Sequence, residues 1–296
     1  MAENIVLKMG CDCNMPFDLM YITNNPLIAK VAIDANINTI FVDMEYIGKE
    51  TRQKNMDSVK NHHTFEDIIA IKSVINKSKV DANLLVRVNP IHENSQTEIN
   101  TAIQCGADII MLPMWKSIAE VEKFISFVNK KAKSYLLLET KEAVSIIDEI
   151  IKLKNIDGIY IGLNDLHLSY NYSFMFEPLS NGLIDYLSSK ITSAGIKFGF
   201  GGLARIGEGT LPAEKILAEH IRLQSSMVIL SRSFCNCQIV EDLKEIQNCF
   251  EKGVSEINKA YISFCNEDNA FFEENRKKVK YIVDEIVEKR GVEIVC

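Results

Sequence analysis

Apolar runs alternate with amphipathic stretches along most of this chain. Between Ser134 and Leu168, one apolar run ends at Glu139, a stretch with apolar residues at helical spacing follows, and a second apolar run ends near Asp165. Neither run alternates with polar residues, which is typical of parallel strands covered on both faces. We therefore predict a strand-helix-strand unit whose two strands end at the same edge of a sheet.

The same alternation recurs before and after this unit and predicts an α/β fold. Helices are expected between the strands, at 211–223 and in two long segments at about 239–263 and 268–290. The expected strands lie at 18–23, 39–45 and 83–90, in the last part of 99–113, at the two runs ending at Glu139 and Asp165, in the first part of 197–209, and at 225–234.

Three helix starts are marked by local chemistry. Pro26 follows two asparagines and stands where a missing N–H costs a helix little. Thr64 with Asp67, and Ser117 with Glu120, have the three-residue spacing of a capping box, in which each side chain accepts a hydrogen bond from the other residue's backbone N–H. We expect helices to begin at these positions.

Glu139 and Asp165 are candidate metal ligands. The predicted unit places their carboxylates side by side, where they repel each other unless a cation lies between them, and hard oxygen ligands suit Mg²⁺ or Mn²⁺. Gly162 and Asn164, beside Asp165, are candidate substrate-binding residues. The alternative interpretation is structural: Glu139 favours the following helix N-terminus and Asp165 caps a turn.

Two arginines are candidates for binding an anionic substrate. Arg87 lies near the end of an otherwise apolar strand, where burial without a partner would be costly. It can present its planar guanidinium to a substrate carboxylate or form a structural ion pair. Arg205 lies in the glycine-rich stretch 197–209, which can approach a ligand closely or cradle phosphate but lacks the pattern of a P-loop.

Residues 46–63 form a polar stretch that is too long for a simple connection. Long loops in compact domains are frequently lids or binding loops. This one concentrates positive charge in an acidic protein and ends with His62 and His63. The alternative is a solvated loop with no part in chemistry.

The composition is typical of an ordinary soluble globular protein. The chain has 296 residues, 47% hydrophobic and 25% charged, and no linker-like stretch divides it, so we predict a single domain over 1–296. A net charge of −7 argues against nucleic acid as the main partner. No apolar run reaches the length of a membrane span, and the first residues lack a signal pattern, so we expect no membrane partner and a cytoplasmic location.

Four motifs, in this order along the chain, resemble the HpcH/HpaI aldolase and citrate lyase family. They are IFVDMEY (40–46), LLVRVNP (84–90), CGADIIMLPM (105–114) and the segment from LLLETKEAV to IDGIYIGLNDLHLS. The resemblance covers about residues 18–235. It implies a (β/α)8 TIM barrel with extra C-terminal helices, the barrel extending over about 18–263.

The resemblance also implies a divalent-metal-dependent carbon–carbon lyase of the class II aldolase type. Such an enzyme acts on a pyruvyl or other 2-oxo-acid substrate through a metal-stabilised enolate. Glu139 and Asp165 match the family's metal positions, and Arg87 matches the arginine that holds the 2-oxo acid. The implied cofactor is Mg²⁺ or Mn²⁺.

The chain departs from the family pattern after its second strand. The aldolase branch has a histidine directly after D-x-E, and the citrate lyase branch has D-L-E-D. Here Tyr46 follows Asp43-Met44-Glu45. The family's acid/base residue therefore does not carry over.

His63, with His62 beside it, is our candidate for the missing acid/base, because histidine titrates near neutral pH. Closure of their loop would bring one of them over the substrate and exclude water. His92, His167 and Tyr46 are the alternatives.

Eight cysteines are scattered through the chain, which favours reduced thiols over a disulfide framework. Two pairs have the C-x-C spacing, Cys11 with Cys13 and Cys235 with Cys237. Together they would supply four thiolates for zinc. The first pair precedes the first strand and the second follows the last, so we expect them at opposite barrel faces and expect no shared metal site.

The preferred hypothesis is a lyase that joins or separates a 2-oxo acid and an aldehyde or sugar. The strings HHTFED, GLNDLHLS, GFGGLAR and ILSRSF resemble a subgroup associated with cell-surface polysaccharide biosynthesis, which implies a sugar-related substrate. One alternative is a citrate-lyase-like lyase of CoA thioesters. Another is a barrel that binds a keto acid or sugar metabolite without converting it, as a sensor or assembly partner.

The last helical segment, about 268–290, carries an apolar stripe that includes Val279 and Val283. An exposed stripe beyond the eighth strand favours packing on another subunit. We therefore expect a homo-oligomer, whether dimer, trimer or hexamer, with this segment as the oligomerisation helix.

Overall fold

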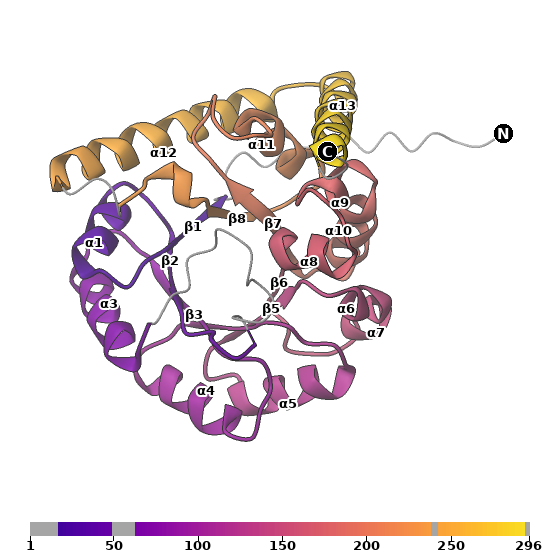
Figure 1. The fold of residues 1–296 in the computed structure, drawn as a ribbon. Coiled ribbons are helices and arrows are strands. Elements are labelled where there is room, and N and C mark those ends of the chain that lie inside the picture. Colours follow the sequence, from indigo (N-terminus) through magenta and orange to yellow (C-terminus); the bar gives the residue numbers. More distant parts are fainter. Residues whose placement is uncertain (1–16, 49–62, 238–241, 294–296) are drawn as a thin grey trace.

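Eight parallel strands form a closed barrel in the order β1 to β8 (Figure 1). The structure is a computed structural model that describes residues 17–48, 63–237 and 242–293, with side chains described up to residue 290. Each strand pairs with the next along the chain, and β1 closes the ring against β8. The expected TIM barrel is confirmed.

The strands lie where the apolar runs predict them. Each is short and buried over most of its length. They are β1 (Asp18–Ile22), β2 (Thr39–Asp43), β3 (Asn83–Arg87), β4 (Ile109–Leu112), β5 (Lys133–Leu138), β6 (Gly158–Ile161), β7 (Lys197–Leu203) and β8 (Met227–Leu230).

Helices surround the barrel in an outer ring (Figure 1). The expected long C-terminal segments are both helical, and a single 3₁₀ turn, η1 (Arg232–Phe234), follows β8. The helices are α1 (Pro26–Asp34), α3 (Phe65–Lys77), α4 (Ser95–Gln104), α5 (Ile118–Val128), α6 (Lys141–Ser145), α7 (Ile147–Ile150), α8 (Leu163–Ser169), α9 (Glu177–Ser180), α10 (Leu183–Ser193), α11 (Ala213–Arg222), α12 (Leu243–Cys265) and α13 (Asn269–Glu293).

The predicted helix starts are confirmed. Thr64 and Ser117 both form complete capping boxes, with Asp67 and Glu120 as their partners. Asn25 caps α1 by accepting hydrogen bonds from two backbone N–H groups, directly before Pro26. Each of these side-chain caps stabilises its helix by about 1 kcal/mol.

One expected helix is divided. The amphipathic stretch after Glu139 forms two short helices, α6 and α7, because the backbone leaves helical geometry at Ile146 (φ −113°, ψ 16°). Ile146 and Ile147 are adjacent β-branched residues, which slightly disfavour a continuous helix. The two short helices still share one buried face. Its residues Ala143, Ile147 and Ile150 are four and three positions apart, as on a continuous helix.

The barrel interior is a packed core of its own. Because side chains alternate across each strand, one set of residues fills the barrel while the other set faces the helices. The interior set is Met20, Phe41, Leu85, Ile109, Met111, Tyr135, Leu137, Tyr160 and Met227. Phe41, Leu137 and Tyr160 of this set also line the pocket described below.

The glycines of β7 make room for a buried tyrosine. A Cβ on Gly199 would lie 2.4 Å from the Met227 carbonyl oxygen and 2.9 Å from the Tyr160 ring. The Tyr160 hydroxyl donates to the Gly201 carbonyl and accepts the Ile229 N–H at 2.9 Å. Tyr160 therefore ties β6, β7 and β8 together at the mouth.

Replacing Gly199 by Ala is expected to lower the free energy of unfolding by about 1–3 kcal/mol, the usual cost of overpacking a rigid core. Urea denaturation monitored by circular dichroism measures the change. Gly202→Ala is the control in the same strand, because its Cβ would meet nothing closer than 3.8 Å. Equal stability of the two variants would contradict the crowding at Gly199.

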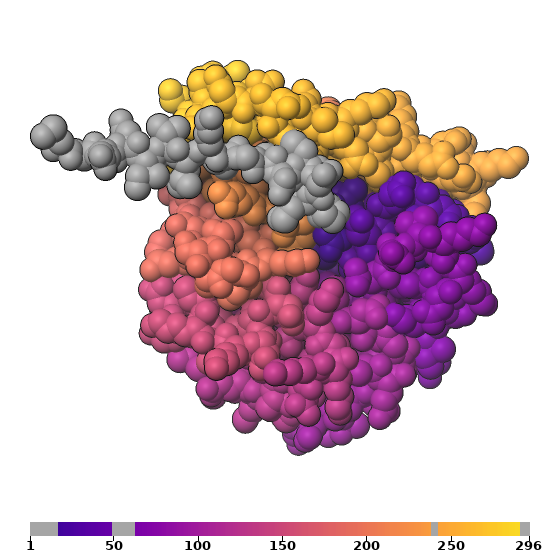
Figure 2. All heavy atoms as spheres, turned by 180° about the vertical axis from the view of Figure 1, so that it is seen from behind, coloured from indigo at the N-terminus to yellow at the C-terminus, as the bar shows by residue number. Residues whose placement is uncertain are grey.

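The two C-terminal helices pack against their own barrel. In the view from behind, α12 and α13 (orange to yellow) lie along one side of the molecule, above the indigo region of α1 (Figure 2). α12 contacts α1 and α11, and α13 contacts α11 and α9. Val279 and Val283, in the predicted apolar stripe, are buried within the chain. Much of the stripe is thus covered without a partner, and oligomerisation remains a prediction.

The end of α13 reaches the segment 171–176, which follows α8. The Arg290 guanidinium donates to the Ser173 carbonyl at 2.6 Å and lies 4.8 Å from the centre of the Phe174 ring. Met175, the next residue, lines the pocket described below.

No helix among the described residues is long and apolar enough to cross a membrane.

Candidate active site

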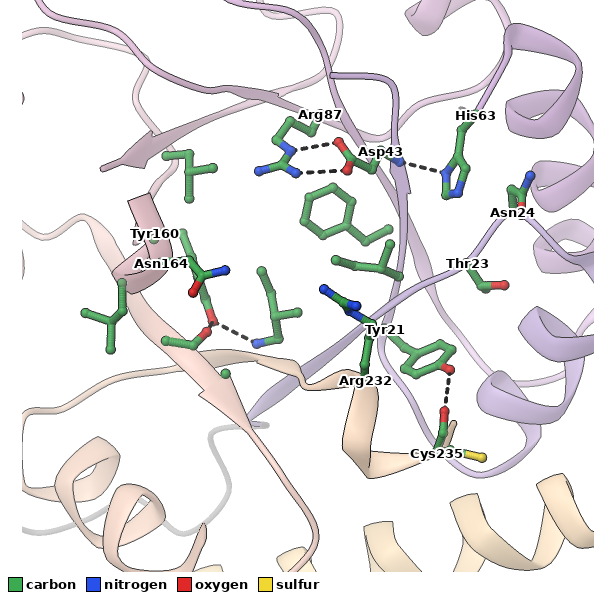
Figure 3. Close-up of a pocket in the computed structure, with 18 of the residues that line it drawn as sticks. Tyr21, Thr23, Asn24, Asp43, His63, Arg87, Tyr160, Asn164, Arg232 and Cys235 are labelled. Atoms are coloured by element: carbon green, nitrogen blue, oxygen red, sulfur yellow. Dashed lines mark hydrogen bonds and ion pairs between the residues drawn. The ribbon is translucent and has the colours of Figure 1, made fainter. Parts of the chain in front are cut away.

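A pocket of 430 Å³ opens at the carboxyl ends of the strands, the face that carries the active site in TIM-barrel enzymes. It is lined from almost every side of the barrel (Figure 3). Its polar and charged lining residues are Tyr21, Thr23, Asn24, Asn25, Asp43, His63, Arg87, Glu139, Tyr160, Asn164, Asp165, Arg232, Cys235, Asn236 and Cys237.

Arg87, the last residue of β3, is held by two acidic residues at the end of the neighbouring strand β2. Its Nε and Nη2 donate to the two Asp43 carboxylate oxygens at 2.8 and 2.9 Å, and its Nη1 lies 3.4 Å from Glu45. Burial lowers the pKa of Arg87, but Asp43 and Glu45 raise it well above its usual value, so the guanidinium stays charged. The structural ion pair, which was the alternative interpretation of Arg87, therefore exists.

The ion pair does not remove Arg87 from the pocket. The side chain is 14% exposed, and the guanidinium faces the cavity (Figure 3). Its contacts with Asp43 and Glu45 involve three of the five N–H groups that an arginine carries. The arrangement fixes the plane of the guanidinium and leaves donors for a substrate carboxylate.

Glu139 follows β5 directly and is almost fully buried, with 2% exposure. Its Oε1 accepts the Met114 N–H at 3.0 Å. Gly162 faces its other oxygen, and a Cβ there would lie 2.9 Å from Oε2. The glycine at the end of β6 thus leaves space beside this carboxylate that any other residue would fill.

Asp165 lies one turn further on than the strand end at which we expected it. The strand β6 ends at Ile161, Gly162 is the N-cap of α8, and Asp165 is the third residue of that helix. It is 8% exposed and lines the same pocket as Glu139. A carboxylate in a first helical turn is stabilised by the helix dipole, whereas the structural interpretation expected Asp165 to cap a turn.

His63 is held against the end of β2. Its Nδ1 accepts the Asp43 backbone N–H at 2.9 Å, and the ring borders the pocket (Figure 3). A backbone N–H can only donate, so the ring proton of the neutral histidine sits on Nε2. The hydrogen-bond donor of neutral His63 is therefore Nε2–H. A second proton, on Nδ1, would point at the Asp43 N–H and would break this hydrogen bond. His62 lies outside the described residues, as do Cys11 and Cys13.

The other described histidines do not line the pocket. His92 contacts the Ser95 hydroxyl at 2.6 Å, and His167 contacts the Leu163 carbonyl at 3.0 Å. His220 is buried and stacked on Phe200, and burial lowers its pKa to about 3.

Tyr46 and Arg205 also lie away from the pocket lining. Tyr46, which replaces the family histidine in sequence, is 62% exposed. Arg205 pairs with Glu208 at 2.6 Å and is not among the residues that border the pocket. Arg232, from the turn after β8, is the second arginine that the structure brings to the cavity.

The chain matches a known protein family. The model of the HpcH/HpaI aldolase/citrate lyase family matches residues 19–199, more than half of the chain. The chain belongs to this family. A comparison with curated proteins gave no match.

Solved structures of HpcH/HpaI proteins share the fold. An HpcH/HpaI aldolase from Desulfitobacterium hafniense DCB-2 superposes with a TM-score of 0.57 at 16% identity, covering 82% of this chain and 93% of that one. The citrate lyase beta subunit from M. tuberculosis, complexed with oxaloacetate and magnesium, gives 0.58 at 13%, covering 84% and 98%. Macrophomate synthase gives 0.53 at 15%, covering 73% and 78%.

The donor set of this HpcH/HpaI family member fits a hard divalent cation. Within the described part of the chain, no three His, Cys, Asp or Glu side chains form a group that could hold a metal ion. Glu139 and Asp165 would supply two carboxylates, and water and substrate oxygens would complete the shell, as Mg²⁺ commonly requires. Gly162 lacks a side chain, and the space that a Cβ would fill there lies directly beside the Glu139 carboxylate.

Sequence reasoning missed the residues that follow β1 and β8. Thr23 and Asn24 line one side of the pocket, and Figure 3 shows Arg232 reaching into it from the turn after β8. Asn164, which was predicted, points into the same space. The available signal was position alone, because the loops that follow the carboxyl ends of the barrel strands build the mouth.

Proposed function

We propose that this protein is a Mg²⁺- or Mn²⁺-dependent lyase that makes or breaks a carbon–carbon bond of a pyruvyl or related 2-oxo acid. The observation that carries the proposal is the convergence of Glu139, Asp165 and Arg87 on one pocket at the carboxyl ends of the strands. Two buried carboxylates and a fixed guanidinium match the charges of a cation and a substrate carboxylate.

Arg87 would bind the carboxylate of the 2-oxo acid. Asp43 holds the guanidinium in one plane, so little side-chain freedom is lost when the substrate binds. Glu139 and Asp165 would hold the cation, which when bound supplies Lewis-acid stabilisation of the negative charge that develops on the keto oxygen as the enolate forms.

His63 would donate a hydrogen bond from Nε2 to the oxygen of the second substrate. The Asp43 N–H fixes Nδ1 as an acceptor, so in this geometry the ring stabilises negative charge on oxygen and does not act as a base. This refines the acid/base role predicted from the sequence. The polar lining from Thr23, Asn24 and Arg232 suits a hydroxyl-bearing aldehyde or sugar.

The proposal predicts that the protein exchanges the C3 protons of pyruvate with solvent only when a divalent cation is present. Purified protein is incubated with pyruvate in D₂O, and exchange is followed by NMR with Mg²⁺, with EDTA, and after Mg²⁺ is restored. We expect exchange to fall to the uncatalysed rate with EDTA and to recover. Exchange that persists at full rate in EDTA would overturn the metal dependence.

A binding function without turnover is the second candidate. The exposure of Tyr46 favours it, because the residue at the position of the family histidine does not line the pocket. Oxalate, a stable mimic of the pyruvate enolate, separates the two functions. Metal-dependent oxalate binding without exchange, and without activity on a panel of aldehydes or CoA thioesters, would favour a sensor. Exchange would favour the lyase.

A further inference from the structure

Two thiols and a phenol meet at the wall of the pocket, beyond β8. Cys235 and Cys237 both line the cavity, and their sulfur atoms lie 3.6 Å apart. The Tyr21 hydroxyl from β1 lies 3.2 Å from the Cys237 sulfur. It also lies 3.1 Å from the Cys235 carbonyl oxygen (Figure 3). The proposed lyase chemistry uses none of these groups.

The surroundings of Cys237 favour its thiolate. In the neutral pair the Cys237 thiol donates to the Cys235 sulfur, but once Cys237 is a thiolate it can only accept, and the Cys235 thiol becomes the donor. The Tyr21 hydroxyl can also turn its hydrogen from the Cys235 carbonyl to the Cys237 sulfur. The Cys235 hydrogen bond lowers the pKa of Cys237 to about 6, against the effect of burial, and Tyr21 contributes to the lowering. The same contact with Cys237, together with burial, raises the pKa of Cys235.

Reactive cysteines have this combination of partial exposure and nearby donors. Cys237 is half-buried and borders a cavity, whereas Cys235 is buried beside it. Cys105 offers the contrast within the same chain. It is also half-buried, but burial and the charge of Glu66 raise its pKa.

We propose that Cys237 is a peroxide-reactive thiol and that Cys235 resolves its oxidation product into a Cys235–Cys237 disulfide. In the first step the Cys237 thiolate attacks one oxygen of hydrogen peroxide. An S–O bond forms, the O–O bond breaks, and hydroxide leaves, so that sulfur loses the two electrons that peroxide gains.

In the second step the Cys235 sulfur attacks the sulfur of the Cys237 sulfenic acid. The S–S bond forms, the S–O bond breaks, and the oxygen leaves as water with the Cys235 proton. The two sulfur atoms, now 3.6 Å apart, must approach to about 2 Å for the S–S bond to form. The product removes the thiol that Tyr21 contacts and changes one wall of the pocket.

Thiol labelling tests the first step on the unmodified protein. The full-length protein is treated briefly with N-ethylmaleimide at neutral pH, and each cysteine is followed by mass spectrometry of tryptic peptides. We expect Cys237 to react at least about tenfold faster than Cys105, because a larger fraction is thiolate. Tyr21→Phe should slow Cys237 and leave Cys105 unchanged. Equal rates at Cys237 and Cys105 would overturn the proposal.

Peroxide treatment tests the second step. Cleavage after Arg232 and Lys244 isolates a peptide that contains Cys235 and Cys237 and no other cysteine. After hydrogen peroxide we expect this peptide to lose the mass of two hydrogens. In Cys235→Ser, Cys237 should instead be trapped by dimedone as the sulfenic acid. A disulfide to Cys249, or oxidation of Cys105 at the same rate, would contradict the assignment.

Discussion

Glu139→Gln and Asp165→Asn are each expected to lower the metal-dependent exchange of pyruvate C3 protons by at least about a thousandfold. Both substitutions keep the size of the side chain and remove one carboxylate charge. The loss of several kcal/mol of charge stabilisation by a bound cation corresponds to this factor. In Glu139→Gln the side-chain amide oxygen can still accept the Met114 N–H that Glu139 accepts, so the backbone contact is preserved.

The exchange assay described above measures the effect, and Mn²⁺ titration followed by electron paramagnetic resonance measures the loss of metal affinity. Glu142→Gln is the matched control, since Glu142 is an acidic residue of α6 that does not line the pocket. Thermal unfolding checks that each variant folds. If either ligand variant binds Mn²⁺ and exchanges protons as the natural chain does, the metal assignment is wrong.

His63→Ala is expected to reduce turnover with an aldehyde substrate by about a hundredfold while Mn²⁺ affinity stays the same. The reduction follows from the lost Nε2 donor, since one well-placed donor to a developing oxyanion contributes about 10²- to 10³-fold to turnover. Metal affinity is unaffected because the histidine is not a proposed ligand. Steady-state kinetics on the substrate found in the aldehyde panel measures the effect.

His63→Asn separates the two roles of this side chain. The asparagine Oδ1 takes the place of Nδ1 and can accept the Asp43 N–H, but no donor remains at the position of Nε2. We expect turnover as low as in His63→Ala. Full turnover in the Asn variant would mean that His63 only positions Asp43. Tyr46→Phe, at an exposed position outside the pocket lining, should change nothing, and a large loss there would point to Tyr46 as the acid/base.

The barrel and the position of its charged residues were predictable because parallel strands end at one face. Asp43, Arg87 and Glu139 each follow or close an apolar run, and that alone predicts that they meet. What the sequence left open was the partner of Arg87. A substrate carboxylate and an aspartate satisfy the same guanidinium geometry, so only coordinates reveal that Asp43 already occupies one edge.

Other parts of the site lie beyond pattern reasoning. Asp165 was expected at a strand end and lies within α8, because element boundaries depend on which backbone N–H groups find partners. Arg232 and Cys237 reach the pocket from a turn without periodicity. The stripe of α13 predicted a helix face that packs against something, but periodicity cannot tell whether the partner surface belongs to another subunit or, as for Val279 and Val283, to the same chain.

The contact of Arg290 with Ser173 and Phe174 connects the last helix, α13, to the wall of the pocket. Met175, the next residue along, lines the pocket. The last turns of α13 therefore support, from the outside, a segment that forms part of the pocket wall. We therefore expect ligand binding in the pocket and docking of the C-terminal helix to be coupled, and such a coupling would be reciprocal.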